Sequence, residues 1–477
     1  MFVDTSRELL RESRFPRISS RFGGDSVITL LSRTLLPTYF FLLLLYSNTP
    51  SGHPAAQISE MYRAVLHTPY IPMTTMLFRI SHILIMLCLW SSYIAKIRTL
   101  SYENSRENWI LAIAITLLAV LTPPVTSRDV FYYSISGEVT SIYKMNPYAT
   151  PPSALPASPL YGYADWKFLT FPYGPIWTVI CGAVVFISGT GPFASTFTFK
   201  ILCGSTVLLS AFLIQKISSK ISLQPSHKAA MLYAMNPIVL VEAAVNAHLD
   251  AFIALLLVLT VLLLISNRKL PGYLALCASA LIKPTTVPLL GFFVAARIQE
   301  ESRLFGKAFQ LAKYLTVAIV LAFITYYPFW HGAETFGFLS SQRFSPSGLI
   351  PLAVVAIMLF RKFALPWAAA TSALASLALV YWSLRRGFEL LLGRARGYRK
   401  EVLIWATFMF LLPVCFYTAY PWYLLPALAL LSITQLYSQR YSRLLFLIAA
   451  CWFTVWTVGT LFFMSLPCCQ GSPLQGT

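Results

Sequence analysis

The sequence predicts an all-α polytopic membrane protein with about 12–14 transmembrane helices. Three observations lead to this fold class. Of the 477 residues, 57% are hydrophobic and only 11% are charged, which is too apolar for a soluble enzyme of this size. Apolar runs repeatedly reach the length needed to cross a bilayer. The lysines and arginines behind the net charge of +19 lie in short loops beside these runs, as cytoplasmic loops do.

The N-terminal residues 1–24 carry five arginines and are expected to form a basic cytoplasmic arm. The first apolar run begins near Val27. Because no small-residue cleavage site follows it, we interpret this run as a retained membrane helix. Residues 25–466 then form one membrane domain, and residues 467–477 form a short tail. The dispersed basic residues give no reason to expect a nucleic-acid partner.

The later apolar runs suggest a series of membrane spans with interruptions. They cover residues 76–93, 109–123, 175–190, 195–215, 229–246, 249–266, 271–296, 309–330, 347–384, 402–419, 421–437 and 443–466. Full-length spans alone cannot place every basic cluster on one side, so 271–296 or 347–384 should contain a half-helix or a hairpin. Asn236-Pro237 and Lys283-Pro284 interrupt apolar runs, and each proline frees a backbone carbonyl that needs a partner. We expect these two breaks to line a cavity.

Residues 124–174 are too polar and rich in proline to cross the membrane, and they follow a run that leads outward. We therefore expect them to form an outer catalytic loop. Part of this loop follows a helical period. Its apolar stripe contains Phe131, Ile135, Val139 and Ile142, and its polar stripe contains Asp129, Tyr133, Ser136, Thr140 and Lys144. The pattern predicts an amphipathic juxtamembrane helix that lies along the membrane surface.

Acidic side chains are scarce, which leaves few candidates for a catalytic carboxylate. Asp129 begins the predicted surface helix, where the helix dipole and Arg128 both favour the ionised carboxylate. Two interpretations of Asp129 stay open: a functional carboxylate, or a cap of its own helix. Glu242 lies inside an apolar run. Since an unpaired carboxylate at membrane depth is costly, Glu242 is expected to be functional or salt-bridged.

His248 and Asp250 lie in a short polar stretch between two apolar runs. They suit a metal site or a hydrogen-bonding loop, and the loop is favoured because no third ligand follows at usable spacing. Lys283 beside its proline suits an anion site, or a lysine whose ammonium extends to the interface. Arg343 in an outer loop is a second candidate for the anion site.

Aromatic residues join two late apolar runs at Tyr420-Pro421-Trp422-Tyr423. They suit a sugar-binding site or the aromatic belt at the membrane surface, of which the belt is the more common outcome. The chain contains no Gly-rich nucleotide loop and no soluble α/β segment. Direct binding of a nucleotide is therefore not expected.

Several motifs together resemble a known family. They are Asp129 in Ser-Arg-Asp-Val-Phe-Tyr-Tyr, Gly137, Asn146-Pro147-Tyr148, and Trp166 ahead of Pro172-Tyr173-Gly174-Pro175. This set resembles the first outer loop of the GT-C glycosyltransferases. It is most similar to the prokaryotic polyprenol-phosphomannose-dependent mannosyltransferases, including the α-1,6-mannopyranosyltransferases of actinobacterial lipoglycan synthesis. Two features differ from that group: Glu138 stands where a basic residue is common, and Asp129 stands where several families have two acids.

The resemblance implies an inverting transfer of a hexose, with mannose favoured, from a polyprenyl-phosphate donor. The acceptor would be a glycan or glycolipid on the non-cytoplasmic face of the membrane, which is the plasma membrane in a prokaryote. Asp129 would be the general base. No cofactor is implied beyond this lipid-linked donor, and a divalent metal lacks support. The expected substrate-binding residues are Arg128, Tyr133, Glu138, Asn146, Tyr148, Tyr173, Glu242, His248, Asp250, Lys283, Arg343, Trp422 and Tyr423.

A polytopic transporter or lipid flippase is the competing class. Such proteins also have broken helices and charged groups at membrane depth, but they usually contain two related halves. The chain contains no second copy of the pattern between Asp129 and Trp177. The glycosyltransferase interpretation is therefore favoured.

Overall fold

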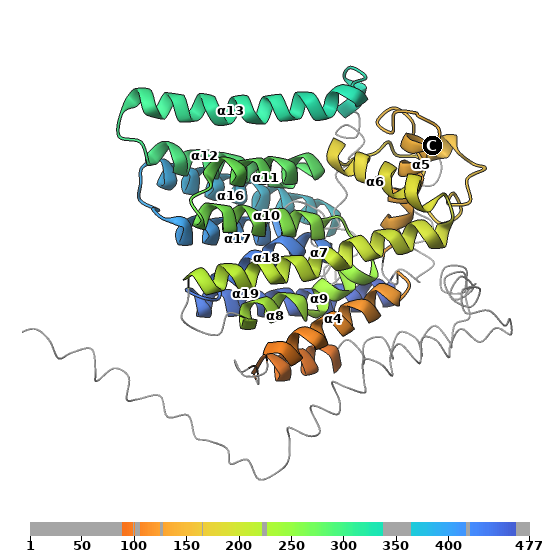
Figure 1. Ribbon diagram of the computed structural model, residues 1–477, viewed down its shortest axis with the longest axis horizontal. Helices are drawn as coiled ribbons and strands as arrows, with labels where there is room; N and C mark the ends of the chain where they lie inside the picture. Colours follow the sequence, from red (N-terminus) through yellow and green to blue (C-terminus); the bar gives the residue numbers. More distant parts are fainter. Residues whose placement is uncertain are drawn as a thin grey trace, which may run out of the picture.

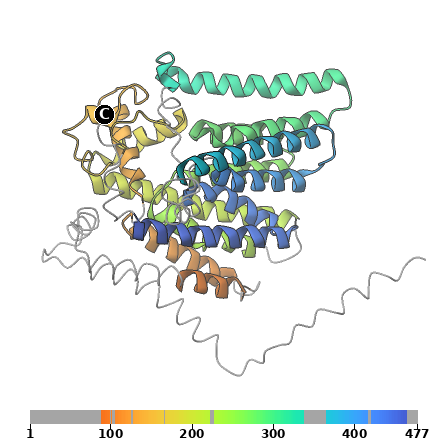
Figure 2. The same ribbon diagram turned by 180° about the vertical axis from the view of Figure 1, so that it is seen from behind.

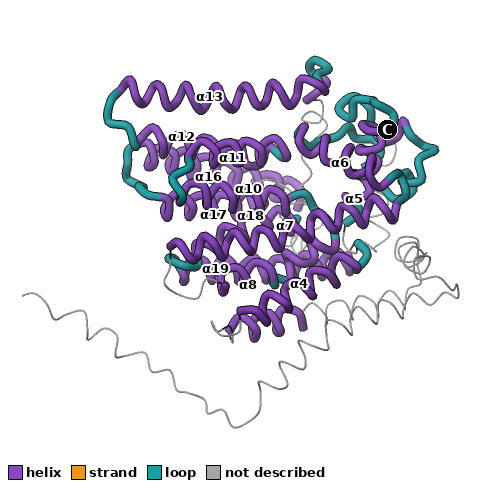
Figure 3. Tube along the Cα trace, in the orientation of Figure 1, coloured by secondary structure: helices purple, strands orange, loops and turns teal. Residues whose placement is uncertain are grey.

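The computed structural model describes residues 88–98, 100, 105–124, 127–164, 166–221, 227–336, 364–415 and 420–463. Within these residues the protein consists of helices and connecting loops and contains no strand (Figures 1 and 3). The predicted basic arm 1–24, Arg343 and the tail 467–477 lie outside the described residues.

Long helices run side by side and form most of the molecule (Figures 1 and 2). The α-helices are α4 (Ser105–Leu121), α5 (Asp129–Ser141), α6 (Pro175–Ser188), α7 (Pro192–Ile221), α8 (His227–Ala234), α9 (Pro237–Val239), α10 (Asp250–Ile265), α11 (Lys269–Ile282), α12 (Val287–Gln299), α13 (Leu304–Tyr326), α16 (Ala364–Leu391), α17 (Tyr398–Cys415), α18 (Leu425–Thr434) and α19 (Gln439–Phe463). The π-helix η4 (Leu240–Val245) continues α9, and the 3-10 helices are η3 (Pro152–Ala154), η5 (Pro284–Thr286), η6 (Tyr327–Phe329), η7 (Glu334–Phe336) and η9 (Pro421–Leu424).

Two of the described helices, Pro192–Ile221 and Leu304–Phe329, are long and apolar enough to cross a membrane. A third candidate is the pair His227–Ala234 and Pro237–Val245, which is bent by 50° at the break between its two parts. For the described residues, the predictions of an all-α fold and of apolar helices long enough to cross a membrane are confirmed.

The apolar run 271–296 forms an antiparallel hairpin, as predicted for one of two runs. Helix α11 ends at Ile282, and α12 begins at Val287 and returns along it. The ion pair between Lys269 Nζ and Glu300 Oε2, at 2.5 Å, joins the start of α11 to the end of α12. Both ends of this run therefore lie on the same side of the molecule.

The run 175–190 was expected to be a span, but it forms only the short helix α6, which packs against α5. Helix α7 then runs from this end of the molecule to the opposite one (Figure 1). We call the two ends the loop end, which holds residues 127–174, and the basic end. At the basic end Arg297 bonds to Glu401 at 2.7 Å, and the basic stretch 385–400 connects α16 to α17. The hairpin and the short α6 together let the basic clusters gather at one end.

Both proline breaks occur where the sequence predicts them. At the first, Asn236 Oδ1 accepts a hydrogen bond from Ile238 N at 2.9 Å, so the side chain caps the new helix. At the second, the Ile282 carbonyl accepts a bond from Gly174 N at 2.8 Å. A Cβ atom on Gly174 would lie 2.0 Å from the Leu281 carbonyl oxygen. Only glycine allows the outer loop to approach the break this closely.

The amphipathic helix exists as α5, but it is buried on both faces. Its apolar residues Phe131, Ile135 and Val139 are fully buried, and so are Tyr133 and Ser136 from the polar stripe. The loop 142–174 folds back over the helix and bonds to its polar groups, for example from Ser158 Oγ to Glu138 Oε2 at 2.5 Å. The helix also ends at Ser141, so Lys144 lies beyond it with a φ of 55°. The part of the prediction that gave α5 an exposed polar face is wrong.

Lys200 of α7 joins the C-terminal ends of two neighbouring helices. Its Nζ donates hydrogen bonds to the carbonyl oxygens of Ala119 at 3.3 Å, Thr122, and Val245 at 2.5 Å. The last carbonyls of a helix lack partners within the helix and carry its negative dipole end, so a lysine satisfies both needs. This contact fixes the end of η4. Residues of the candidate site lie within η4 and directly after it.

Candidate functional site

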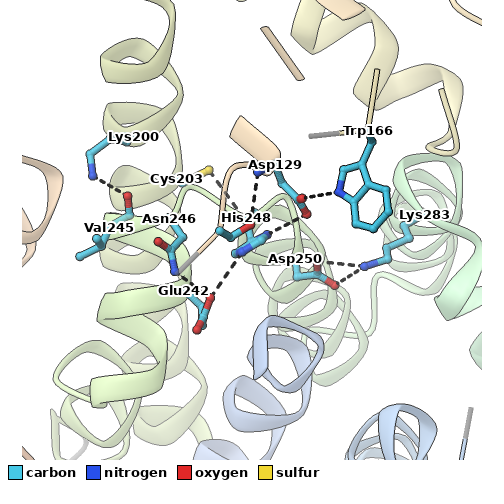
Figure 4. Close-up of polar contacts among 11 residues, drawn as sticks. Asp129, Trp166, Lys200, Cys203, Glu242, Val245, Asn246, His248, Asp250 and Lys283 are labelled. Atoms are coloured by element: carbon cyan, nitrogen blue, oxygen red, sulfur yellow. Dashed lines mark hydrogen bonds and ion pairs between the residues drawn. The ribbon is translucent and has the colours of Figure 1, made fainter. Parts of the chain in front are cut away.

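Five charged or titratable residues from three separate stretches of the chain lie close together at the loop end of the bundle (Figure 4). They are Asp129, Glu242, His248, Asp250 and Lys283, which we call the Asp129 cluster. Asp129 and Lys283 are 8% and 7% exposed, and Glu242 and His248 are fully buried. Charged groups are rarely buried unless they are paired, so their contacts define the site.

Asp129 is the first residue of α5, and its carboxylate points away from its own helix into the cluster. Arg128 occupies the N-cap position and makes no side-chain capping bond. Asp129 Oδ1 accepts a hydrogen bond from Trp166 Nε1 at 3.2 Å, and Oδ2 lies 3.7 Å from His248 Nδ1 (Figure 4). The carboxylate is thus engaged with the outer loop and with the segment after η4.

His248 is held between carboxylates and aromatic rings. Its imidazole stacks on Trp422 with ring centroids 3.9 Å apart and an interplanar angle of 13°. Trp422 stacks in turn on Tyr420 at 4.4 Å. The second ring nitrogen, Nε2, lies 3.4 Å from Glu242 Oε2. Burial, followed by the charge of Lys283, lowers the pKa of His248 well below its usual value, so the ring is neutral at neutral pH.

Glu242 is positioned by the π-helix η4, a wider turn than the α-helix and one that is common at functional sites. Its Oε2 accepts a hydrogen bond from Asn246 Nδ2 at 3.0 Å. Its backbone carbonyl accepts a bond from His248 N at 3.0 Å, across the turn in which Ala247 has a φ of 58°. This tight turn directs the imidazole back toward the Glu242 carboxylate.

Lys283 and Asp250 form a buried ion pair. Lys283 Nζ lies 3.0 Å from each carboxylate oxygen of Asp250 and 3.7 Å from the centre of the Tyr423 ring. The lysine sits in the break between α11 and η5 and has extended backbone, while Asp250 begins α10. The break therefore delivers a cation into the cluster, next to an aromatic face that also attracts cations.

Tyr133 and Tyr173 lie beside the cluster, with their rings packed edge to face at a centroid distance of 5.5 Å. Burial, and next the charge of Asp129, raises the pKa of the Tyr173 hydroxyl well above its usual value. Tyr173 therefore stays protonated and keeps its ability to donate a hydrogen bond.

Three expected substrate-binding residues make structural contacts instead of joining the cluster. Glu138 accepts the bond from Ser158, and Asn146 Nδ2 donates to the Phe329 carbonyl at 2.7 Å. Tyr148 is buried, and its hydroxyl donates to the Tyr173 carbonyl at 2.9 Å. In this arrangement they hold the outer loop together and anchor it to α5 and η6.

Three residues that were not among the expected substrate-binding residues also contact the cluster. Trp166 appeared only as part of the family resemblance, yet it bonds to Asp129. Asn246 bonds to Glu242, and Tyr420 completes the aromatic stack. The Asn-x-His-x-Asp spacing at 246–250 was a signal for Asn246, whereas no local spacing shows that Trp166 or Tyr420 lies near Asp129. Among the described residues, no group of three His, Cys, Asp or Glu side chains is arranged to hold a metal ion.

Comparisons with known proteins agree with the resemblance. The family model described as "Alpha-(1->6)-mannopyranosyltransferase, N-terminal domain" matches residues 40–299, more than half of the chain. The α-(1→6)-mannopyranosyltransferase A of Mycobacterium tuberculosis is 24% identical over 190 residues, which cover 40% of this chain and 36% of that protein. The protein of the same name from Corynebacterium glutamicum is 24% identical over 185 residues, which cover 38% of this chain and 37% of that protein. No solved structure matches significantly.

The matched region spans little more than a third of the length of these relatives. The region that the family model matches nevertheless contains every member of the Asp129 cluster, since these residues all fall between positions 40 and 299. The aromatic residues of η9 lie beyond it. The chain belongs to the α-(1→6)-mannopyranosyltransferase family.

Proposed function

We propose that this protein is a multi-pass membrane mannosyltransferase. It transfers mannose from a polyprenyl-phosphate donor to a glycan or glycolipid acceptor on the non-cytoplasmic face. The observation that carries this proposal is the placement of the Asp129 carboxylate, which is directed into a cluster that also holds a cation and a stack of aromatic rings. The family membership indicates mannose as the sugar, and the cluster contains the base and the cation that the reaction needs.

Asp129 acts as the general base. It takes the proton of the acceptor hydroxyl while the hydroxyl oxygen attacks the anomeric carbon of the donor, and the configuration at that carbon inverts. Its carboxylate is nearly buried, with 12% of the side chain exposed, and one oxygen is fixed by Trp166. A carboxylate held in this way is oriented before the substrate arrives, which lowers the barrier to the proton transfer.

Lys283 stabilises the phosphate that leaves. An ammonium group has three N–H donors, and a cation beside a developing phosphate charge is worth most in a site with little water. The Asp250 carboxylate and the Tyr423 ring already contact the ammonium. A donor phosphate therefore shares Lys283 with Asp250 and displaces the ring contact. Arg128 at the start of α5 and Arg343 are the alternatives for this role.

The lipid donor enters from the bilayer, and the acceptor enters from the aqueous side at the loop end. The separation of the basic end from the loop end supports this orientation, since basic loops are retained in the cytoplasm. Trp422 and Tyr423 of η9 lie against His248 and Lys283, which suits them to contact the sugar ring.

The test is a transfer assay with purified protein and two mannose donors, a synthetic polyprenyl-phosphate mannose and a nucleotide-linked mannose. We expect transfer to an oligomannoside acceptor only from the lipid-linked donor, with the new bond inverted relative to the donor. Transfer from the nucleotide-linked sugar alone would contradict the proposed donor. Movement of the lipid-linked sugar between leaflets of a vesicle without transfer would indicate a flippase instead.

A further inference from the structure

Three side chains form a continuous chain of potential proton carriers in the Asp129 cluster. His248 Nδ1 lies 3.7 Å from Asp129 Oδ2, and His248 Nε2 lies 3.4 Å from Glu242 Oε2 (Figure 4). Each ring nitrogen therefore faces a different carboxylate. Glu242 is fully buried, and its Oε1 atom has no hydrogen-bond partner. The proposed step in which Asp129 acts as the general base does not by itself give Glu242 a role.

The imidazole cannot easily rotate away from this arrangement. One face stacks on Trp422, and the backbone N–H bonds to the Glu242 carbonyl. The backbone carbonyl of His248 accepts a weak bond from Cys203 Sγ at 3.8 Å. The ring is therefore held with one nitrogen toward each carboxylate, and a proton can pass once these separations shorten to hydrogen-bond distance.

The contacts also indicate which ring nitrogen carries the proton. A neutral imidazole has one N–H donor and one acceptor nitrogen. Asn246 donates to Glu242 Oε2, so that oxygen is an acceptor, and Nε2–H is the donor that faces it. Nδ1 then presents its lone pair to Asp129. The separation of 3.7 Å fits this assignment, since a lone pair and a carboxylate oxygen make no hydrogen bond until one of them gains a proton.

We propose that His248 and Glu242 are positioning residues that receive, through Asp129, the proton released by the acceptor. This inference rests on the proposed function. The acceptor O–H bond breaks, its proton goes to Asp129, and its electron pair forms the bond to the anomeric carbon. The bond from that carbon to the phosphate breaks, and the phosphate keeps the electron pair.

The second stage restores the base. The new O–H of Asp129 donates its proton to Nδ1, and Nε2–H passes its proton to Glu242. His248 stays neutral in its other tautomer, Asp129 is again a carboxylate, and Glu242 is a carboxylic acid. After the products leave, the proton returns by the same path to Asp129 and from there to water. The relay keeps the proton away from the new glycosidic oxygen during product release.

The charges around His248 come from several elements. Asp129 faces it from α5, Glu242 from η4, and Lys283 contributes from the break after α11 with its partner Asp250 from α10. Glu242 can accept the proton only in its ionised form, and its complete burial disfavours that form. The acid limb of the parental kcat profile should therefore follow the ionisation of Glu242, and a variant without this carboxylate should lose that dependence.

The test compares two near-isosteric variants, Glu242→Gln and His248→Gln, with the parent. Glu242→Gln keeps an oxygen for Asn246 but cannot accept the proton, and His248→Gln breaks the path between the carboxylates. We expect kcat to fall by about tenfold or more in each variant, while KM for polyprenyl-phosphate mannose changes little. Since both variants interrupt one path, the double variant should be no slower than the slower single variant. The acid limb of the kcat profile should move to lower pH in Glu242→Gln.

Matched controls come from His331 and Glu334, an exposed pair outside the cluster whose Nε2 and Oε2 atoms lie 3.2 Å apart. His331→Gln and Glu334→Gln should retain the parental kcat and pH profile. A kcat within threefold of the parent in Glu242→Gln, multiplicative losses in the double variant, or an unmoved acid limb would overturn the relay. If His248→Gln fails to fold, as judged by Tm in detergent, Glu242→Gln alone decides the question.

Asp129→Asn is assayed in the same series to separate this inference from the proposed function. An inactive Asp129→Asn beside fully active Glu242→Gln and His248→Gln would leave Asp129 as the base and refute the relay. An active Asp129→Asn would refute both.

Discussion

Lys283 Nζ lies 3.0 Å from both carboxylate oxygens of Asp250, and both side chains are almost completely buried. The pair joins the break after α11 to the start of α10, which lie at the same end of the molecule. Removal of one member of a buried ion pair leaves the other charge without compensation, which costs far more than removal of both. Each member of the pair is therefore needed to compensate the charge of the other, in addition to the proposed role of Lys283 in the phosphate site.

This relationship predicts how Lys283 variants behave. Lys283→Met alone should destabilise the folded protein by about 3–5 kcal/mol, because Asp250 is left buried and unpaired. The double variant Lys283→Met, Asp250→Asn should recover most of the Tm while KM for the lipid donor stays raised. Thermal unfolding in detergent and donor titrations separate the two effects. A double variant with parental donor kinetics would move the phosphate role to Arg128 or Arg343.

Gly174 should not tolerate a side chain. A Cβ atom would lie 2.0 Å from the Leu281 carbonyl oxygen, so Gly174→Ala must push the outer loop away from the α11 break. Strain of this kind costs about 1–3 kcal/mol or more. Gly162→Ala is the control from the same loop, since a Cβ atom added there would have no other atom within 4 Å. Equal Tm values for the two variants would show that the loop approaches the break less closely.

Glu138 gives a pH-dependent prediction. Burial raises its pKa above the usual value, and the bond from Ser158 partly opposes this. The folded state then holds its proton more tightly than the unfolded state, so the favourable contribution exists at low pH and is lost as pH rises from about 4.5 through the raised pKa. Glu138→Gln keeps the acceptor for Ser158 without the charge. Its Tm should exceed that of the parent at pH 8 and approach it at pH 4; a constant difference across this range would argue against the shift.

The orientation of the protein can be tested by thiol labelling. Single cysteines at Ala157 in the outer loop and Lys400 at the start of α17 are exposed positions at the two ends of the molecule. In a cysteine-free background, an impermeant reagent applied to intact cells should label only the first, since the basic end is retained inside. Labelling of Lys400→Cys but not Ala157→Cys would place the Asp129 cluster on the cytoplasmic face.

Much of the candidate site follows from local chemistry in the sequence. Proline removes an N–H donor and so disfavours a continuous helix, and the helices are indeed interrupted at Asn236-Pro237 and Lys283-Pro284. Glu242, His248 and Asp250 were noticeable because charged groups are costly in an apolar run. The cluster around Asp129 offsets the cost of burying these charged groups, since each of them has a polar partner there.

Other features depend on contacts that no local pattern records. The polar stripe of α5 indicated a face open to water, yet the loop covers it, as in the bond from Trp166 Nε1 to Asp129 Oδ1 at 3.2 Å. The run 175–190 has the composition of a span, and only its packing against α5 shows that α6 stays at the loop end. Trp166 lies 37 residues from Asp129. Only the folded loop brings the two together.

Asp129 is the proposed general base, and one substitution tests this role directly. Asp129→Asn keeps the size of the side chain and an oxygen for Trp166 Nε1, but it cannot accept a proton. Mannosyl transfer from polyprenyl-phosphate mannose should fall by a factor on the order of 10²–10⁴ while Tm stays close to that of the parent. Glu334→Gln, which changes an exposed carboxylate at the loop end, is the matched control and should keep the parental rate. Transfer by purified Asp129→Asn within a few-fold of the parent would contradict this role, and Glu242 or Asp250 would become the carboxylate to test.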